Sequence, residues 1–447
     1  MDLIAKHDDL RSSPEFHRAV EVYRFFYPIV SAEAALEGHR KLGLADNRDA
    51  YLVALTPSTT AFTGNSDTPY LTMNLNLRTA GPMVVEIPAG PYMGFVNDHN
   101  YRAVQDLGLA GPDAGSGGRH LILPPGWEGT VPDGYHAVQA RTFELWLLVR
   151  TVPANGQVDD ALAALRLLNV YPMAEASAPP SLAFVDDQDI HNTPVPWEDN
   201  IQFWEHLHRV LSTEPPIDEY RVMYALAASL GITHDEPFAP NSSERELLEH
   251  AARAGRDALL ASGYASTRAE RVVWDDRHWE WLHIGGDANF ETSHGMDLEA
   301  RERWFSQAIG VTPKMLLRSP GVGSLYWSAY RDSAGAFLVG GKSYRLTVPL
   351  PVPAGQFWSI TIYDSASRSQ IRTAQGKAAL RSVVELTEST GNESVDLHFG
   401  PVQPNGGADR WIQTNPGGQW FAFLRIYQPQ PSAFDGSWRP GDFVETT

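Results

Sequence analysis

The strongest strand signal in the chain is the stretch WFAFLRIY at residues 420–427. Successive residues of a strand point to opposite faces, so residues 420, 422, 424 and 426 share one face and residues 421, 423, 425 and 427 share the other. Both faces carry bulky side chains, which predicts a central strand covered on both sides. Tyr344, Leu346, Val348 and Leu350 alternate in the same way with Arg345 and Thr347. The region from about residue 335 onward is therefore predicted to form a sheet domain.

Working outward, residues 50–157 hold short apolar runs such as MVVEI at 83–87 and FELWLLV at 143–149, separated by Gly and Pro turns. Such a pattern of short apolar runs and turns is typical of a β-sandwich or β-barrel. Between 158 and 330 the apolar period lengthens to that of helices, and 14–43 also has a helical pattern. A further helix is expected at 243–261, with Ser243 as N-cap and Glu246 completing a capping box.

The predicted fold is mainly β with a helical middle, in which two β-sandwich domains are linked by α-helices. We expect an N-terminal helical segment at 1–45, a first sandwich at 46–157, a helical connecting region at 158–330 and a second sandwich at 331–447. Such an arrangement creates an inter-domain crevice, which is a favoured place for a small-molecule site.

Composition narrows the class of protein. The 447 residues, 43% hydrophobic and 20% charged, fit a globular chain of two or three domains. The formal charge of −19 argues against nucleic acid and against an anionic membrane surface as partners. The chain has no cysteine, which excludes disulfides, iron–sulfur clusters and thiol nucleophiles. Acids at the N-terminus do not fit a signal peptide, and no run approaches about 18 apolar residues, so a cytoplasmic protein is expected.

The first candidate site group is Asn65, Asp67, Thr68 and Tyr70. Asp67 is predicted to be a general base or a metal ligand and Tyr70 a proton donor, with Asn65 as a polarising amide, because acid–base catalysis needs two ionisable groups within hydrogen-bond reach. The alternative is that Asn65 and Asp67 only shape a turn through side-chain-to-backbone bonds.

The second group is the polar run 97–102, which follows the apolar Met93-Gly94-Phe95 strand. We expect Asp98, His99, Tyr101 and Arg102 to fan out from a strand end into one pocket, with His99 as the best single proton shuttle. The alternative is a solvated loop.

The third group lies in the segment FWSITIYD at 357–364, from which Trp358 and Tyr363 are predicted to bind substrate. Arg368 and Arg372 follow it and are able to clamp a carboxylate or sulfate, since the guanidinium fork matches planar anions. The alternative for both arginines is surface ion pairing.

Histidine spacing does not by itself define a metal site. The pairs His206/His208 and His278/His283 are spaced so that their side chains point apart on a helix. No metal ligand is therefore assigned, although a metal ion is possible if Asp67, Asp98 and His99 converge. No organic cofactor is expected, because a dinucleotide-binding glycine motif is missing. A set of tryptophans is a candidate aromatic wall for an apolar ligand: Trp274, Trp279, Trp281 and Trp304.

Several motifs together carry a family resemblance. Three segments resemble the first domain of a bacterial and fungal family, domain of unknown function 1254. They are the Asn65-x-Asp67-Thr68-x-Tyr70 signature, the run GPMVVEIP at 81–88 and the run PPGW at 124–127. Four later segments are similar to the usual partner of that domain, domain of unknown function 1214. They are LVGGKSYRL at 338–346, FWSITIYD at 357–364, LRIYQP at 424–429 and DGSW at 435–438.

This resemblance implies two sandwiches of jelly-roll character with helical connections, often in an oligomer, so a homo-oligomer is expected. It implies no established reaction. The chain departs from the family pattern at Pro91-Tyr92, at 373–378 and at 410–413, which are loop segments able to line a crevice.

The leading functional hypothesis is a cofactor-independent enzyme that acts on a moderately apolar small molecule by hydrolysis, elimination or rearrangement. Asp67 or His99 is expected to be the base, Tyr70 or Tyr363 the acid, and Arg102 an anion stabiliser. The hypothesis requires the Asp67 turn and the 97–102 run to share one hollow. The alternatives are a non-catalytic ligand-binding or assembly protein and a metal-dependent hydrolase.

Overall fold

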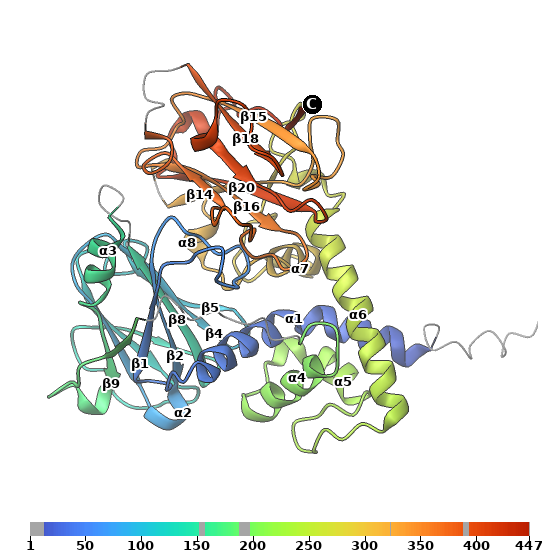
Figure 1. Ribbon diagram of the computed structural model, residues 1–447. Coiled ribbons are helices and arrows are strands. Elements are labelled where there is room, and N and C mark those ends of the chain that lie inside the picture. The colour runs from blue at the N-terminus through green and yellow to red at the C-terminus, as the bar shows by residue number, and fades with distance from the viewer. Residues whose placement is uncertain (1–12, 152–156, 187–196, 322, 388–392, 447) are drawn as a thin grey trace, which may run out of the picture.

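The computed structural model describes residues 13–151, 157–186, 197–321, 323–387 and 393–446. Two β-rich bodies and a layer of helices make up the molecule, with the first body at the lower left of Figure 1, the second above it and the helices at the lower right. Among the described helices, none combines the length and the apolar character needed to cross a bilayer. The fold prediction of two sandwiches with helical connections is confirmed.

The first body packs two sheets face to face. The six-stranded sheet has the order β10 (Ala183–Val185), β1 (Asp49–Val53), β2 (Tyr70–Asn76), β8 (Glu144–Thr151), β4 (Tyr92–Asp98), β5 (Ala103–Gly108). The four-stranded sheet has the order β7 (Tyr135–Gln139), β6 (Gly118–Leu123), β3 (Met83–Ile87), β9 (Asn169–Pro172). Apolar side chains from both sheets, among them Met73, Val85 and Leu147, form the core between them. Since β9 and β10 belong to this body, it extends past the expected boundary at residue 157.

The second body is also a sandwich. One sheet has the order β11 (Trp279–Trp281), β14 (Ser324–Ala329), β20 (Trp420–Tyr427), β16 (Trp358–Asp364), β17 (Ala379–Arg381). The other has the order β19 (Trp411–Gln413), β18 (Ser394–Gly400), β15 (Ser343–Pro349), β21 (Val444–Thr446). Strands β11 and β14 begin before residue 331, so this sandwich recruits the end of the region that was expected to be helical.

Strand β20 is central in its sheet, as its two bulky faces predict. Trp420 and Leu424 pack into the core between the two sheets. Phe421 and Phe423, on the opposite face, join the large cluster that includes the helical layer. The second sandwich therefore buries both faces of this sheet, one in its own core and one against the rest of the molecule.

The helical layer surrounds α1 (Pro14–Lys41), which packs against α4, α5, α6 and α7. Ser13 caps this helix by accepting a hydrogen bond from the backbone N–H of Phe16, and Pro14 occupies the first turn. The remaining helices are α2 (Leu77–Ala80), α3 (Val158–Leu165), α4 (Gln202–Thr213), α5 (Arg221–Ala228), α6 (Ser242–Tyr264), α7 (Leu298–Phe305) and α8 (Pro313–Leu316). A two-strand ribbon, β12 (Glu291–Thr292) and β13 (Gly295–Met296), precedes α7.

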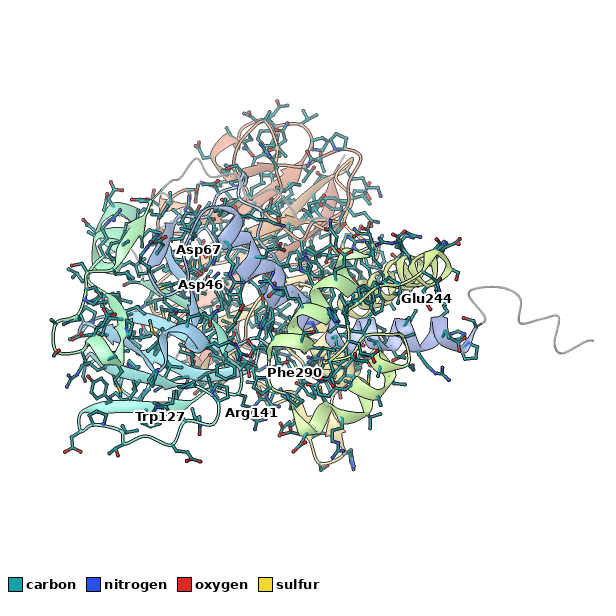
Figure 2. The ribbon with its side chains drawn as sticks, turned by 90° about the horizontal axis from the view of Figure 1, so that it is seen from below. Asp46, Asp67, Trp127, Arg141, Glu244 and Phe290 are labelled. Atoms are coloured by element: carbon teal, nitrogen blue, oxygen red, sulfur yellow. The ribbon has the colours of Figure 1, made fainter. Side chains whose placement is uncertain are left out.

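The N-terminal cap of α6 differs from the expected one. Asn241, not Ser243, is the N-cap, and its side chain accepts from the backbone N–H groups of Ser243 and Glu244. The carboxylate of Glu244 accepts from the N–H of Asn241 and completes the capping box. The predicted box was therefore placed two residues too far along the chain. In Figure 2, Glu244 lies on the helical side of the molecule, opposite Trp127 of the first sandwich.

Candidate functional site

The loop between β1 and β2, residues 54–69, leaves the first sandwich and reaches the outer face of the second (Figure 1). Several hydrogen bonds hold its middle there. The backbone N–H of Thr63 donates to the carbonyl of Arg368 at 2.7 Å, Arg425 donates to the carbonyl of Thr63 at 3.1 Å, and the Tyr363 hydroxyl donates to the carbonyl of Gly64 at 3.0 Å. The loop thus brings the Asn65–Tyr70 motif against β16 and β20.

Asp67 is only 6% exposed at this contact. Its Oδ2 oxygen accepts hydrogen bonds from Ser359 Oγ at 2.5 Å and from the Tyr427 hydroxyl at 2.8 Å. The Oδ1 oxygen is buried and has no hydrogen-bond partner among the described residues. One oxygen is therefore fixed in place while the other remains able to accept a proton.

Asn65 forms hydrogen bonds both within its own turn and to the second sandwich. Its Oδ1 accepts from the backbone N–H of Asp67 at 2.8 Å, which is the turn-forming bond of the alternative reading. Its Nδ2 donates to the Tyr427 hydroxyl at 2.6 Å. Because that hydroxyl in turn donates to Asp67, a relay of hydrogen bonds runs from Asn65 through Tyr427 to the carboxylate.

Arg425 lies beside this relay and is almost completely buried. Its guanidinium donates to Thr361 Oγ1 at 3.0 Å and to the Tyr363 hydroxyl at 2.6 Å. Burial raises the pKa of Tyr363 to about 12, although Arg425 opposes that shift. At neutral pH Tyr363 is therefore a neutral hydroxyl that takes a hydrogen bond from a cation and donates one to the loop.

Arg150 is the second guanidinium of the cluster. It stands opposite Tyr70 in the register of β2 and β8, lies near Tyr326, and is 6.0 Å from the ring centre of Tyr427. Burial raises the pKa of Tyr70, while Arg150 and Arg425 oppose the shift. Tyr70 thus keeps its proton near neutral pH and is placed beside a cation.

Positive charge exceeds negative charge in this cluster. Among the described residues, no carboxylate forms an ion pair with Arg150 or with Arg425. Asp67 is the one carboxylate in direct hydrogen-bond contact with the relay, whereas nearby Arg381 is paired with Glu385 at 2.5 Å. Two guanidiniums therefore share a single nearby carboxylate, and because unbalanced charge away from water is costly, the cluster favours an anionic ligand.

A shallow concavity borders the cluster at Tyr326. The side chains that line it are mainly aromatic or apolar: Trp281, Leu282, His283, Trp304, Met315, Leu316, Leu317, Arg318, Ser324, Leu325 and Tyr326. Arg318 stacks on Trp281 at 4.0 Å from the ring centre. Burial, with Arg318 adding to it, lowers the pKa of His283 to about 4, so this imidazole is neutral at pH 7. Trp281 and Trp304 of the predicted aromatic wall are here, whereas Trp274 and Trp279 belong to the core of the second sandwich.

The run 97–102 forms the tight turn between β4 and β5. Asp98 Oδ1 accepts from the backbone N–H groups of Asn100 and Arg102 at 2.8 and 2.9 Å, so this carboxylate shapes the turn. Burial raises the pKa of Asp98 to about 6. Tyr101 has a positive φ of 53° and stacks on Phe305 with ring centres 5.4 Å apart. Arg102 pairs with the exposed Glu291 at 3.1 Å.

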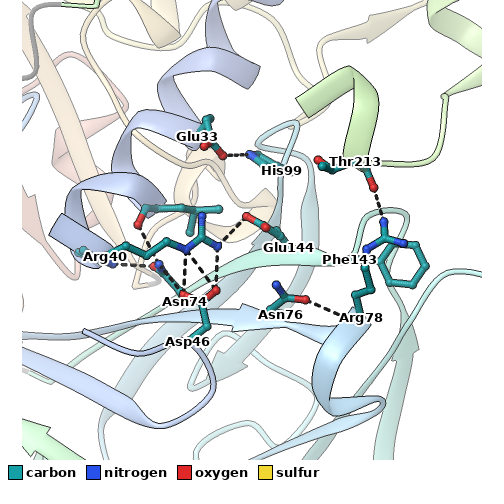
Figure 3. A network of polar contacts seen from close by, with 12 residues as sticks. Glu33, Arg40, Asp46, Asn74, Asn76, Arg78, His99, Phe143, Glu144 and Thr213 are labelled. Carbon is teal, nitrogen blue, oxygen red and sulfur yellow. Dashed lines mark hydrogen bonds and ion pairs between the residues drawn. The ribbon is translucent and has the colours of Figure 1, made fainter. Parts of the chain in front are cut away.

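His99 lies between two buried carboxylates, Glu33 and Glu214, of which Figure 3 labels Glu33. Its Nε2 is 3.0 Å from Glu33 of α1, and its Nδ1 is 3.3 Å from Glu214 at the end of α4. Burial by itself lowers the pKa of His99, but its contacts with Glu214 and Glu33 outweigh that effect and raise it to about 9. The solvated-loop alternative does not describe this run, since Asp98, His99 and Tyr101 are buried.

The two predicted groups do not meet. On the central strand β8, Tyr70 pairs with Arg150, whereas Asp98 pairs with Leu145. Five residues of strand at about 3.4 Å each place the two groups about 17 Å apart along the sheet. The expectation of one hollow shared by Asp67 and His99 is therefore not met, and Arg102 is not available to an anion held near Asp67.

The other predicted residues are placed as follows. Thr68 is buried beside Tyr70, and Tyr363 belongs to the cluster. Trp358 lies in the core of the second sandwich, on the face of β16 opposite Ser359. Arg368 is buried and pairs with Glu198 at 2.5 Å, so it is not a surface ion pair.

Sequence reasoning missed five members of the cluster: Arg150, Tyr326, Ser359, Arg425 and Tyr427. The alternation of residues 420–427 puts Arg425 and Tyr427 on the same face of the strand, and this much can be predicted from the sequence. Knowing what packs on that face required the three-dimensional structure.

Comparisons with known proteins agree with this architecture. Residues 47–172 match the model of a protein family of unknown function, DUF1254, and residues 323–431 match a second one, DUF1214. A comparison with curated proteins gives no match.

A solved structure of low sequence identity is similar in fold. The crystal structure of the VPA0106 protein from Vibrio parahaemolyticus matches with a TM-score of 0.60 at 15% identity, over 97% of this chain and 100% of that one. A putative uncharacterized protein from Burkholderia cenocepacia matches with a TM-score of 0.42 at 12% identity, over 97% and 94% of the two chains. With both domain models matched in order on the two sandwiches, the chain belongs to the family of two-domain proteins that join a DUF1254 domain to a DUF1214 domain.

Proposed function

We propose that this protein is an enzyme that needs no organic cofactor and uses acid–base chemistry on a small anionic molecule held between the 54–69 loop and the second sandwich. The observation that carries the proposal is the carboxylate of Asp67. It is buried, one of its oxygens is fixed by Ser359 and Tyr427, and the other has no partner among the described residues.

Asp67 is suited to the role of general base. Two donors on Oδ2 hold the carboxylate in one orientation before a substrate arrives, which lowers the reorganisation needed during reaction. Oδ1 then accepts a proton from the substrate or from an attacking water. Tyr70 is suited to return a proton to the leaving group, because it keeps its proton at neutral pH and lies beside Arg150.

Arg150 and Arg425 are suited to binding the anionic group. Neither has a carboxylate partner among the described residues, and a planar guanidinium binds carboxylate or sulfate through paired hydrogen bonds. Arg150 is only half-buried, so a ligand is able to approach it from solvent. Negative charge that develops during reaction would be stabilised by the same two groups.

The bordering concavity suggests the rest of the substrate. Its aromatic and apolar lining, including Trp281 and Trp304, fits a ring or short apolar body, and Tyr326 connects it to Arg150. The substrate class that fits best is a small aryl sulfate, or an aryl ester that also carries a carboxylate. The reaction is hydrolysis, elimination or rearrangement.

Ligand binding without catalysis is the second candidate, because the Asn65–Tyr427–Asp67 relay also fastens the two sandwiches together. Metal-dependent hydrolysis at Asp67 has less support, since His99, the histidine expected to converge with Asp67 and Asp98 on a metal ion, lies at the other end of the sheet. A cytoplasmic location and assembly into a homo-oligomer remain proposals.

The test uses wild type, Asp67→Asn and, as a matched control, Asp257→Asn on the exposed side of α6. Benzoate, phenyl sulfate and a panel of aryl esters are first screened by thermal shift for binding, and those that bind are then followed by mass spectrometry for conversion. We expect wild type and Asp257→Asn to convert a bound compound, and Asp67→Asn to bind it but lose conversion by about a hundredfold or more.

Equal conversion by Asp67→Asn would refute the role of the base. Binding without conversion in wild type, together with unchanged affinity in Asp67→Asn, would favour the ligand-binding alternative. Binding that survives Arg150→Met would contradict the anion site.

A further inference from the structure

A second cluster of ionisable groups lies at the opposite end of the first sandwich, where α1 and α4 cover the β4–β5 turn. Glu33 reaches it from α1, His99 from the turn and Glu144 from the start of β8 (Figure 3). One ligand atom from each of these three residues lies within 4.8 Å of the other two. Nothing in the proposed reaction uses these groups.

The imidazole of His99 is oriented as in a metal ligand. Its Nδ1 is within hydrogen-bond distance of Glu214 at 3.3 Å, and Glu214 is itself held by the backbone N–H groups of Phe143 and Glu144 at 2.7 and 2.8 Å. A carboxylate that accepts a hydrogen bond from one ring N–H orients the imidazole and turns the other ring nitrogen toward a cation.

That other nitrogen, Nε2, is buried and faces the cluster. Glu33 Oε2 lies 3.0 Å away as an ion-pair partner. His99 is 2% exposed, and its Nε2 has no hydrogen-bond partner among the described residues. This nitrogen therefore faces the carboxylates of the cluster at a distance at which two ligands of one cation can stand.

The charges of the cluster also favour a divalent cation. Four carboxylates contribute negative charge: Glu33, Asp46, Glu144 and Glu214. Two guanidiniums oppose them, Arg209 on Glu33 at 2.7 Å and Arg40 on Asp46 and Glu144 at 2.8 Å each. When a cation displaces the extra proton of His99, the imidazole becomes neutral and the four carboxylates exceed the two guanidiniums by two charges. The neighbouring Glu37 is paired with Lys41 and His206 and does not change this balance.

From this geometry we propose that Glu33, His99 and Glu144 bind one divalent first-row cation, Zn²⁺ or Mn²⁺, with Glu214 as the carboxylate that orients the histidine. One imidazole and two carboxylates are ligands that both ions accept. Arg40 donates to Oε2 of Glu144, so the cation takes the other oxygen of that carboxylate. Glu144 is only half-buried, and it gives the ion an approach from solvent.

The role of the cation is structural. It joins the N-terminal helix to the first sandwich at two points, the β4–β5 turn and the start of β8. A ligand that binds only the folded protein stabilises it by mass action, so occupancy raises the melting temperature in proportion to the logarithm of the free ion concentration.

The test compares wild type with Glu144→Gln, and with Asp46→Asn as the matched control. Asp46 binds the same Arg40 and carries the same charge but is not among the three ligands. The full-length proteins are treated with EDTA, dialysed and titrated with ZnCl₂, and bound zinc is measured by plasma mass spectrometry after gel filtration. Co²⁺ is added in parallel, because its visible absorption reports coordination number.

We expect wild type and Asp46→Asn to bind roughly one zinc per chain with a rise in melting temperature, and Glu144→Gln to bind at least about tenfold more weakly with a smaller rise. Absence of zinc on wild type would overturn the proposal. So would equal binding by Glu144→Gln, since the ion would then be held elsewhere. An equal loss in Asp46→Asn would show that net charge alone attracts the cation, and would overturn the ligand assignment.

Discussion

Removing the charge of Glu198 is expected to destabilise the junction between the helical layer and the second sandwich. Its Oε1 accepts from the Tyr27 hydroxyl and from Arg368, each at 2.5 Å, and Oε2 is 3.3 Å from Arg256. The Arg368 side chain is 1% exposed. The substitution Glu198→Gln keeps the shape of the side chain and leaves Arg368 as a buried cation without a counter-charge.

The expected loss in the free energy of unfolding follows from the burial of the ion pair between Glu198 and Arg368. Breaking a buried ion pair by neutralising one partner costs about 3–5 kcal/mol, whereas the partly exposed contact with Arg256 adds less than about 1 kcal/mol. The amide oxygen of Gln still accepts from Tyr27, which places the estimate at the lower end. We therefore expect a loss of about 3 kcal/mol in the free energy of unfolding.

The assay is urea denaturation followed by tryptophan fluorescence, with Glu15→Gln as control. Glu15 pairs with Arg18 on the surface of α1, where the side chains are 52% and 44% exposed, so the control is expected to change stability by less than about 0.5 kcal/mol. A loss below about 1 kcal/mol for Glu198→Gln would refute the reasoning. A double variant, Glu198→Gln with Arg368→Met, should recover part of the loss, because it removes the unpaired charge.

The pH dependence gives an independent check on the same residue. Burial tends to raise the pKa of Glu198, but Arg368, Tyr27 and Arg256 together lower it below the usual range. A carboxylate with a lowered pKa in the folded state contributes stability above its unfolded value of about 4.3, and that stability is lost as the pH falls through the folded-state pKa. The difference in melting temperature between wild type and Glu198→Gln is therefore expected to shrink below about pH 4.

Two further predictions concern local structure. Asn241→Ala removes the cap of α6 and is expected to cost about 1 kcal/mol in thermal unfolding, while Ser243→Ala is expected to be nearly neutral; the reverse order would contradict the assigned cap. Gly108 and Gly126 have φ values of 68° and 70°, but a Cβ at Gly108 would collide with the carbonyl oxygen of Tyr92, whereas one at Gly126 would meet nothing within 4 Å. For Gly126→Ala we expect a loss of about 1–2 kcal/mol in the free energy of unfolding, which comes from backbone strain alone. Gly108→Ala should lose clearly more, because the collision adds to the strain. Equal losses of the two variants in urea denaturation would show that only strain acts at both positions.

The fold was predictable to the extent that it depends on local pattern. The alternation at 420–427 identifies a central strand, because both faces of that stretch carry bulky side chains. The cap of α6 was harder to place, since Asn241, Ser242 and Ser243 are all good caps and both Glu244 and Glu246 stand at suitable spacing. Local chemistry alone does not choose between them.

The candidate site depends on contacts between residues far apart in the chain. Asp67 and Tyr427 are 360 positions apart, and no local pattern reports that the 54–69 loop docks on β20. The prediction that Asp67 and His99 share one hollow was wrong for a related reason. Both groups lie at strand ends, but only the order β2–β8–β4 and its register reveal that these are opposite ends of the sheet.

The central position of α1 has a consequence for biosynthesis. Apolar residues of this helix, such as Phe26 and Val30, share one core with Leu207 of α4, Phe305 of α7 and Phe423 of β20. The helix leaves the ribosome early, yet its partners emerge roughly 170 to 400 residues later, which at about 5–20 residues per second is tens of seconds of waiting. During that interval its apolar surface lacks the partners that cover it in the folded protein, so we expect aggregation of the nascent chain to begin at this helix rather than at the later strands.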